Sequence, residues 1–254
     1  MLKDFSKEKF DIIIQAGQSN SQGYGFGPTD EPYQPSDKVW YLHNNMTLSI
    51  AAEKVINNGI QSNLGLSFAR EYINGGRLAD DRKLLIIRAA VGGTGFLDNH
   101  WKSTDDLYLK MMEMIDTALS LNPENRLVAM LWHQGETDAT LKATYDQHYG
   151  HLSTLVNSVR ESFSCPDLPF IAGDFVHHWR DANMEICTPV LDAIRAVCGK
   201  DRSGFVETDG LESNLQGNFE HPLGWRHDAI HFSRKSVYEL GKRYYAKLCE
   251  ITSK

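Results

Sequence analysis

The chain has 254 residues, of which 41% are hydrophobic and 23% are charged, and this composition is typical of a soluble globular protein with a well-buried core. The net charge of −7 is spread along the sequence without a basic cluster, which argues against nucleic acid or an anionic membrane surface as a partner and favours a neutral or cationic small substrate. Residues 1–11 lack the apolar core of a signal peptide, and no segment approaches the roughly 20 apolar residues of a membrane span. We therefore expect a cytoplasmic protein, with export by another route left open.

Strands and helices are predicted to alternate along the whole chain. The first apolar run, Ile12 to Ile14, has the character of a central parallel strand. In chain order, the predicted elements are this strand, a strand over 38–42, a helix over 64–75, a strand over 83–93, a helix over 104–123, a strand over 126–136, a helix over 145–163, a strand over 169–176, a helix over 189–199, a strand over 204–211 and a final helix from 233.

This alternation predicts an α/β protein. Strands that alternate with helices of these lengths imply right-handed crossovers and a mostly parallel sheet covered by helices on both faces. We see no internal repeat, low-complexity tract or linker, so a single domain over residues 1–254 is the simplest expectation. The four cysteines lie far apart without a CxxC pair, and we expect them to be reduced thiols.

Polar segments follow several of the predicted strands. They are "GQSN" (17–20), "GGTG" (92–95), "HQGETD" (133–138) and "DAIHFS" (228–233). Because the carboxyl ends of parallel strands meet at one edge of a sheet, segments far apart in sequence can come together there. These four segments are therefore the predicted functional site.

Ser19, Asp228 and His231 are the candidate catalytic residues within these segments. Asp228 can accept a hydrogen bond from one imidazole nitrogen of His231, and the other nitrogen can then take the proton of Ser19. Simpler interpretations stay open: Ser19 could be only the N-cap of a helix, and Asp228 and His231 could be helix-entry residues.

The same chemistry needs donors for an oxyanion. The candidates are the backbone N–H groups of Ser19 and Gly93 and the side-chain amide of Gln134. A phosphate-binding turn is the alternative for "GGTG", but the full GxGxxG pattern is absent. His133, Glu136, His148 and His151 do not have a regular metal-ligand spacing, so we expect no metal site.

Together these segments resemble the SGNH (GDSL-like) hydrolases, and specifically their sialate O-acetylesterase and acetylxylan esterase branch, carbohydrate esterase family six. "GQSN" is similar to the nucleophile block of that branch, "WHQGETD" to its third block and "DAIHFS" to its closing DxxH block, while Ser21 stands where many members have methionine. The resemblance implies Ser19 as nucleophile, His231 as general base and acid, Asp228 as its orienting group, and an oxyanion hole from Ser19, Gly93 and Gln134. It also implies a three-layer α/β/α sandwich with a flavodoxin-like five-stranded sheet.

The expected function is a serine esterase that removes O-acetyl groups from a carbohydrate such as a sialic acid or a xylan fragment, without a cofactor. Asn20 and Glu136 are expected to support the catalytic residues, and Trp101, Trp179 and Trp225 to stack on the sugar. A short-chain lipase-like or thioester hydrolase with the same triad, and a non-catalytic carbohydrate-binding protein, are the alternatives. The sequence carries no indication of the oligomeric state.

Overall fold

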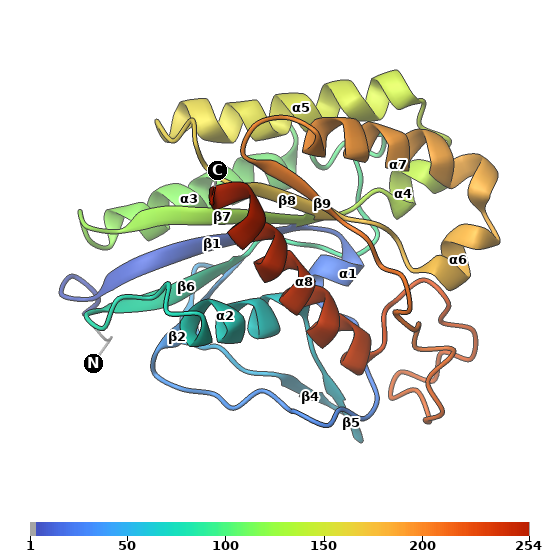
Figure 1. The fold of residues 1–254 in the computed structure, drawn as a ribbon, viewed down its shortest axis with the longest axis horizontal. Coiled ribbons are helices and arrows are strands. Elements are labelled where there is room, and N and C mark those ends of the chain that lie inside the picture. Colours follow the sequence, from blue (N-terminus) through green and yellow to red (C-terminus); the bar gives the residue numbers. More distant parts are fainter. Residues whose placement is uncertain (1–3, 254) are drawn as a thin grey trace.

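A seven-stranded sheet with the order β3-β2-β6-β1-β7-β8-β9 forms the centre of the computed structural model, which describes residues 4–253 (Figure 1). The strands are β1 (Lys9–Gly17), β2 (Val39–His43), β3 (Leu48–Ile50), β6 (Arg82–Arg88), β7 (Arg126–His133), β8 (Phe170–Gly173) and β9 (Ser203–Val206). All neighbours pair in parallel except β3, which pairs antiparallel with β2. The expected mostly parallel α/β architecture is confirmed.

The expectation of five strands was wrong. The six strands predicted along the chain all enter one sheet, and β3 adds an antiparallel edge. A separate hairpin of β4 (Lys54–Ile56) and β5 (Gly59–Gln61) turns at Asn57, which has a φ of 51°. β3, β4 and β5 have three residues each and no fully buried side chain, so they carry too few positions for an apolar alternation to appear.

Helices cover both faces of the sheet, as expected (Figure 1). Alternate residues of the central strand β1 point to opposite faces: Ile12 and Ile14 belong to one buried cluster and Ile13 to the other. The first cluster includes the apolar faces of α3 (Asp106–Ser120), α5 (Tyr145–Ser162) and α7 (Met184–Cys198). The second includes those of α2 (Leu64–Asn74) and α8 (Arg234–Thr252).

The predicted helices agree with the structure except at the start of α7. The prediction began this helix at Pro189. The helix instead begins at Met184, and Pro189 lies inside it. Three short helices are also present: α1 (Ser19–Gln22), α4 (Glu136–Thr140) and α6 (His177–Asp181).

Two other expectations concern the cysteines and the membrane. All four cysteines are free thiols in the structure. Among the helices of residues 4–253, none combines the length and the apolar character that a membrane crossing requires.

The central strands approach one another closely at their carboxyl ends. Gly17, the last residue of β1, has a φ of 117°, and a Cβ at this position would lie 2.3 Å from the carbonyl oxygen of His133 at the end of β7. Only glycine fits this approach. The backbone of Gln18 then donates to the same carbonyl over 2.9 Å. These contacts place the segment after β1 beside the segment after β7.

Candidate active site

Ser19 begins the short helix α1 directly after the turn that ends β1. Its side chain is largely buried, with 6% of the residue exposed. The backbone N–H of Gly23 donates to the Ser19 carbonyl over 2.8 Å and closes this single helical turn. A serine at this position lies at the carboxyl edge of the sheet, where ligands bind in open α/β folds.

Asp228 and His231 lie in the long segment between β9 and α8. Nδ1 of His231 is 2.6 Å from Oδ1 of Asp228. The second oxygen, Oδ2, accepts from the Asn214 side-chain amide over 2.7 Å and is 3.1 Å from Nε2 of His221. Burial acts to raise the pKa of Asp228, but the hydrogen bonds from His231 and Asn214 and the charge of His231 outweigh burial and lower the pKa. The carboxyl group therefore stays ionised at neutral pH.

A cavity of about 540 Å³ brings three of the predicted residues together. Ser19, Gly93 and His231 line it, and Asp228 lies behind His231. The other lining residues are Gln18, Gln22, Tyr24, Val91, Gly92, Glu136, Thr137, Thr140, Leu141, Trp225 and Ile230. Within residues 4–253, no hydrogen bond joins the side chains of Ser19 and His231, a contact that often tightens only when substrate binds. A hydroxyl facing the same cavity as a carboxylate-bound imidazole can act as an activated nucleophile.

Aromatic rings surround His231 within this cavity. The rings of Tyr24 and Trp225 stack on the imidazole, with centroid distances of 5.1 and 5.6 Å. Tyr24 and Trp225 also stack on each other, and Trp225 is 42% exposed. These contacts present an apolar wall beside the imidazole.

Of the three tryptophans expected to stack on a sugar, Trp225 is the one among the cavity residues. The expectation was wrong for Trp101, which is completely buried and donates from Nε1 to Oγ1 of Thr94 over 2.9 Å. Trp179 packs against Phe175, and neither Trp101 nor Trp179 lines this cavity. Loop position alone does not distinguish a core tryptophan from an exposed one, because loops also fold over the core.

Gly93 and Gln134 are placed differently. Gly93 lies in the loop after β6, has a φ of 72° and lines the cavity. Its neighbour Gly92 also lines the cavity, and a Cβ added at Gly92 would be 3.4 Å from Cβ of Ser19. Gln134 is buried and is not among the lining residues. Its amide nitrogen donates to Oδ2 of Asp138 over 2.9 Å.

Asn20 and Glu136 form a buried contact directly behind Ser19. Nδ2 of Asn20 donates to Oε1 of Glu136 over 2.8 Å. Burial raises the pKa of Glu136, with the hydrogen bond from Asn20 acting in the opposite direction. Glu136 therefore lies both against the turn that carries Ser19 and at the cavity wall.

Sequence reasoning missed Asn214, His221 and Tyr24. Asn214 and His221 precede Asp228 by 14 and 7 residues, and neither stands in a recognisable motif. Asn214 also donates to the carbonyl of Tyr24 over 2.8 Å, which joins the loop after α1 to the segment that carries His231. Its partners are distant in sequence, so no local signal could have found it.

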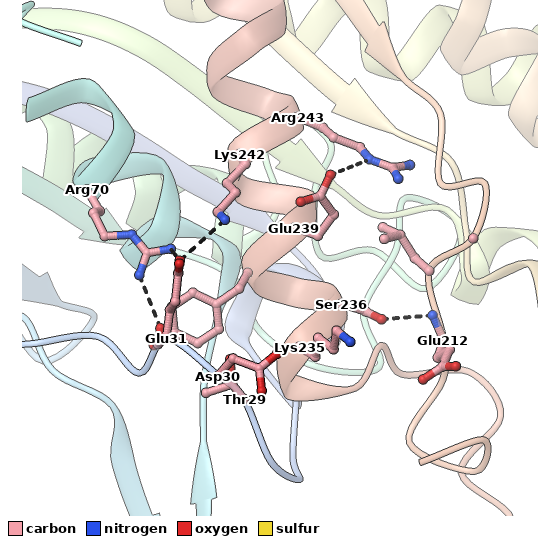
Figure 2. A pocket seen from close by; sticks show the side chains of 13 residues that line it. Thr29, Asp30, Glu31, Arg70, Glu212, Lys235, Ser236, Glu239, Lys242 and Arg243 are labelled. Carbon is pink, nitrogen blue, oxygen red and sulfur yellow. Dashed lines mark hydrogen bonds and ion pairs between the residues drawn. The ribbon is translucent and has the colours of Figure 1, made fainter. Parts of the chain in front are cut away.

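Another cavity, of about 380 Å³, lies between residues 29–31 and α8 (Figure 2). Several of its charges pair with one another: Glu31 lies 3.6 Å from Arg70 and 3.5 Å from Lys242, and Glu239 lies 3.1 Å from Arg243. None of the predicted site residues lines this cavity. We therefore place the candidate site in the Ser19 cavity.

The sequence matches a known protein family over most of its length. Residues 9–250 match the family described as "Carbohydrate esterase, sialic acid-specific acetylesterase". The chain is similar to a probable 9-O-acetyl-N-acetylneuraminic acid deacetylase of Escherichia coli (strain K12), 21% identical over 229 residues that cover 69% of this chain and 70% of that protein. It is also similar to a probable carbohydrate esterase of Arabidopsis thaliana, 25% identical over 127 residues that cover 47% of this chain and 46% of that protein.

Among solved structures, the crystal structure of NanS has the same fold. The TM-score is 0.79 at 17% sequence identity, with 98% of this chain and 99% of the NanS chain covered. Because the family match spans nearly the whole chain, the protein belongs to the carbohydrate esterase family of sialic acid-specific acetylesterases.

Proposed function

We propose that the protein removes O-acetyl groups from a carbohydrate through an acyl-enzyme formed on Ser19. The observation that carries this proposal is the single cavity lined by Ser19, Gly93 and His231, with Asp228 bonded to the far side of the imidazole over 2.6 Å. We also propose the narrower assignment of the protein to carbohydrate esterase family six. This assignment rests on the "GQSN", "QGE" and "DxxH" segments.

In this mechanism His231 is the general base and then the general acid. Nδ1 donates a hydrogen bond to Asp228, so Nε2 is the nitrogen that can accept the Ser19 proton as Oγ attacks the acetyl carbonyl. The imidazolium returns this proton to the sugar oxygen as that C–O bond breaks. Water then attacks the acetyl-serine with His231 again as base, and acetate leaves. Asp228 stabilises the imidazolium because its lowered pKa keeps it ionised.

The oxyanion of each tetrahedral intermediate needs donors. The N–H groups of Ser19 and Gly93 are proposed for this role, together with Gln134. Asp138 accepts a hydrogen bond from one N–H of the Gln134 amide, and the described residues provide no acceptor for the other N–H. Asp138 would therefore orient the amide, and the remaining N–H would be free for the oxyanion.

The substrate is proposed to be an acetylated sugar with a short acyl group. The sequence has no lid-like apolar insertion that would cover a long chain, and the wall of Tyr24 and Trp225 can stack on a sugar face. The curated relative from Escherichia coli carries the name of a 9-O-acetylated sialic acid, so this compound comes first in a substrate panel.

Acetate release from 4-nitrophenyl acetate and from a panel of acetylated sugars tests the proposal. Ser19→Ala should abolish release from every ester that the unmodified protein hydrolyses. Ser21→Ala is the matched control, because Ser21 is buried two residues away and its hydroxyl has no partner within the part of the chain described. Activity that survives in Ser19→Ala would exclude Ser19 as the nucleophile.

A further inference from the structure

The turn that carries Ser19 ends in carbonyl groups that its own helix leaves without partners. α1 is a single turn, and within residues 4–253 no backbone N–H donates to its last two carbonyls, those of Ser21 and Gln22. Two side chains supply the donors instead: Nε2 of Gln15 donates to the Ser21 carbonyl, and Nη2 of Arg88 donates to the Gln22 carbonyl. The position of Ser19 thus depends on two side chains outside its own turn.

Gln15 and Arg88 are themselves held by a ring of contacts across the central strands. Arg88, the last residue of β6, donates from Nη1 to Oε1 of Gln15 in β1 over 3.2 Å. Its guanidinium lies 4.9 Å from the ring centroid of Tyr41 in β2. Nε2 of Gln15 also donates to Oδ1 of Asn63 over 3.2 Å, and the amide nitrogen of Asn63 donates to the Tyr41 hydroxyl over 3.0 Å. The donors for the Ser19 turn therefore come from strands of the central sheet and are fixed there.

The charge of Arg88 is not used in an ion pair. Its two acceptors are the neutral oxygens of Gln15 and Gln22, and no carboxylate in the described part of the chain forms an ion pair with it. Glu53, an acid in the wall of the same cavity, accepts from Arg234 with both oxygens, over 2.8 and 2.7 Å. A charged donor forms a stronger hydrogen bond than a neutral one. The guanidinium therefore holds the Gln22 carbonyl more firmly than a neutral side chain would.

Gln22 extends this constraint to the loop after β6. Its side-chain oxygen accepts from the backbone N–H of Gly92 over 2.7 Å, and a Cβ added at Gly92 would be 3.4 Å from Cβ of Ser19. The N–H of the next residue, Gly93, has no acceptor among the residues described. Gln22 therefore connects both backbone donors of the proposed oxyanion hole, Ser19 through the main chain and Gly93 through its side chain.

We propose that Arg88 is a positioning residue for ester hydrolysis, which holds Gln22 and so sets the distance between the backbone N–H groups of Ser19 and Gly93. This rests on the proposed function, because it takes these two groups as donors to the oxyanion. Arg88 itself touches no part of the substrate in this role. A displacement of about 1 Å in a catalytic site can cost about a hundredfold in rate, so loss of the guanidinium should act on the transition state.

Kinetics of Arg88→Ala and Arg88→Lys on 4-nitrophenyl acetate test this role. Arg88→Ala should lower kcat about ten- to a hundredfold and change KM less than about twofold, because oxyanion donors act in the transition state. Arg88→Lys keeps a cationic donor and should recover part of the loss. An unchanged kcat in Arg88→Ala would overturn the proposal. So would a higher KM at unchanged kcat, since Arg88 would then contact the substrate.

Lys54→Met is the matched control for charge. Lys54 is exposed and lines the same cavity as Arg88, of about 780 Å³, but it does not donate to the Ser19 turn. Its removal should leave kcat unchanged. A loss as large as in Arg88→Ala would mean that the positive charge of the cavity matters in place of the contact with Gln22, and would overturn the proposal.

Guanidinium ion in solution separates positioning from a general loss of structure. Arg88 is half-buried and lines a cavity, so a small cation can reach the space that Arg88→Ala leaves. Millimolar guanidinium chloride should restore part of the kcat of Arg88→Ala, whereas sodium chloride at the same ionic strength should not. A misfolded variant would not recover, because guanidinium weakens folded proteins. Equal effects of the two salts would show that the turn does not need the guanidinium group, and would overturn the proposal.

Hydrogen exchange of the Gly92 amide, followed by NMR, tests the same contacts without turnover. This amide should exchange about tenfold faster in Gln22→Ala and in Arg88→Ala than in the unmodified protein, as expected for the loss of one hydrogen bond. Faster exchange in Arg88→Ala, in a protein that hydrolyses no ester, would support the contacts of Arg88 and refute the proposed function. Hydrolysis by the unmodified protein, with unchanged exchange and kcat in Arg88→Ala, would refute the positioning role and leave the proposed function intact.

Discussion

Asn20 donates a hydrogen bond from Nδ2 to Oε1 of Glu136 over 2.8 Å, and this contact joins the turn that carries Ser19 to the residue that starts α4. The same nitrogen donates to the carbonyl of Ile230 over 2.9 Å, and Oδ1 accepts from the backbone of Phe232 over 3.1 Å. Asn20 therefore holds three segments in one buried arrangement, and the residue between Ile230 and Phe232 is His231. This network sets the position of the imidazole relative to Ser19.

Substitutions at Asn20 and Glu136 should separate hydrogen bonding from charge. Asn20→Asp would turn a carboxylate toward Glu136 and the Ile230 carbonyl, and we expect turnover to fall about a hundredfold or more, beyond the loss in Asn20→Ala. Glu136→Gln keeps an acceptor for Asn20 and should retain most activity. The measurement is kcat on 4-nitrophenyl acetate, with circular dichroism to verify folding. A large loss in Glu136→Gln would instead assign Glu136 a role that needs its charge.

Asp228 contacts two imidazoles, and they should contribute unequally. Asp228→Asn is expected to lower kcat by about 10³- to 10⁴-fold, because an amide neither stabilises the imidazolium nor holds the correct tautomer of His231. His221→Phe keeps the ring beside Phe26 and Trp225 but removes Nε2 from Asp228, and the loss should be less than about tenfold. Steady-state kinetics on one acetyl ester compare the two. Equal losses would mean that His221 and His231 are equivalent partners of Asp228.

Gln134 should contribute to the transition state and little to substrate binding. Gln134→Ala is expected to lower kcat about a hundredfold with little change in KM, as for the loss of one oxyanion donor. Gln134→Glu places a carboxylate beside Asp138 and should be worse. Asp138→Asn tests the orientation of the amide, and it also weakens the contacts to the backbone of Phe96 and Leu97. An unchanged kcat in Gln134→Ala would remove Gln134 from the oxyanion hole.

The stability of the protein should depend on pH through His133. This side chain is fully buried, and burial lowers its pKa from 6.5 to about 3. Between these values the unfolded chain binds a proton that the folded chain does not, so the free energy of unfolding falls with falling pH, by up to about 1.4 kcal/mol per pH unit. The raised pKa of the neighbouring Glu136 acts in the opposite sense.

His133→Asn isolates this contribution. Asparagine can keep a donor for the Tyr244 hydroxyl, which lies 3.1 Å from Nδ1 of His133, but it binds no proton. Urea unfolding at pH 7, 6 and 5 should show a smaller loss of stability on acidification in the variant than in the unmodified protein, since Glu136 is common to both. If the free energy of unfolding depended on pH in the same way in both proteins, His133 would not be the cause of the loss of stability at acidic pH.

The local pattern of the sequence was sufficient for the mostly parallel α/β architecture, whereas the choice of site segments stays a prediction. Ile12 to Ile14 is apolar on both faces, so it belongs in the middle of a parallel sheet, and the polar residues that follow it belong at the ligand edge. The same reasoning selected Ser19, Gly93 and His231, which share one cavity. These conclusions depend on residues near one another in sequence, because apolar side chains recur at a regular spacing within a strand or a helix and this spacing is visible in a short segment.

Tertiary structure alone decided the rest. The three residues of β3 gain their hydrogen bonds from β2, Trp101 is buried because its loop folds over Trp132, and Asn214 reaches Asp228 only in the folded chain. Arg88 lay within the strand predicted over 83–93, and only the folded chain brings its guanidinium beside the ring of Tyr41 and the carbonyl of Gln22. Whether a charge is paired or a ring is buried depends on neighbours brought together by packing, and a linear sequence does not show which neighbours those are.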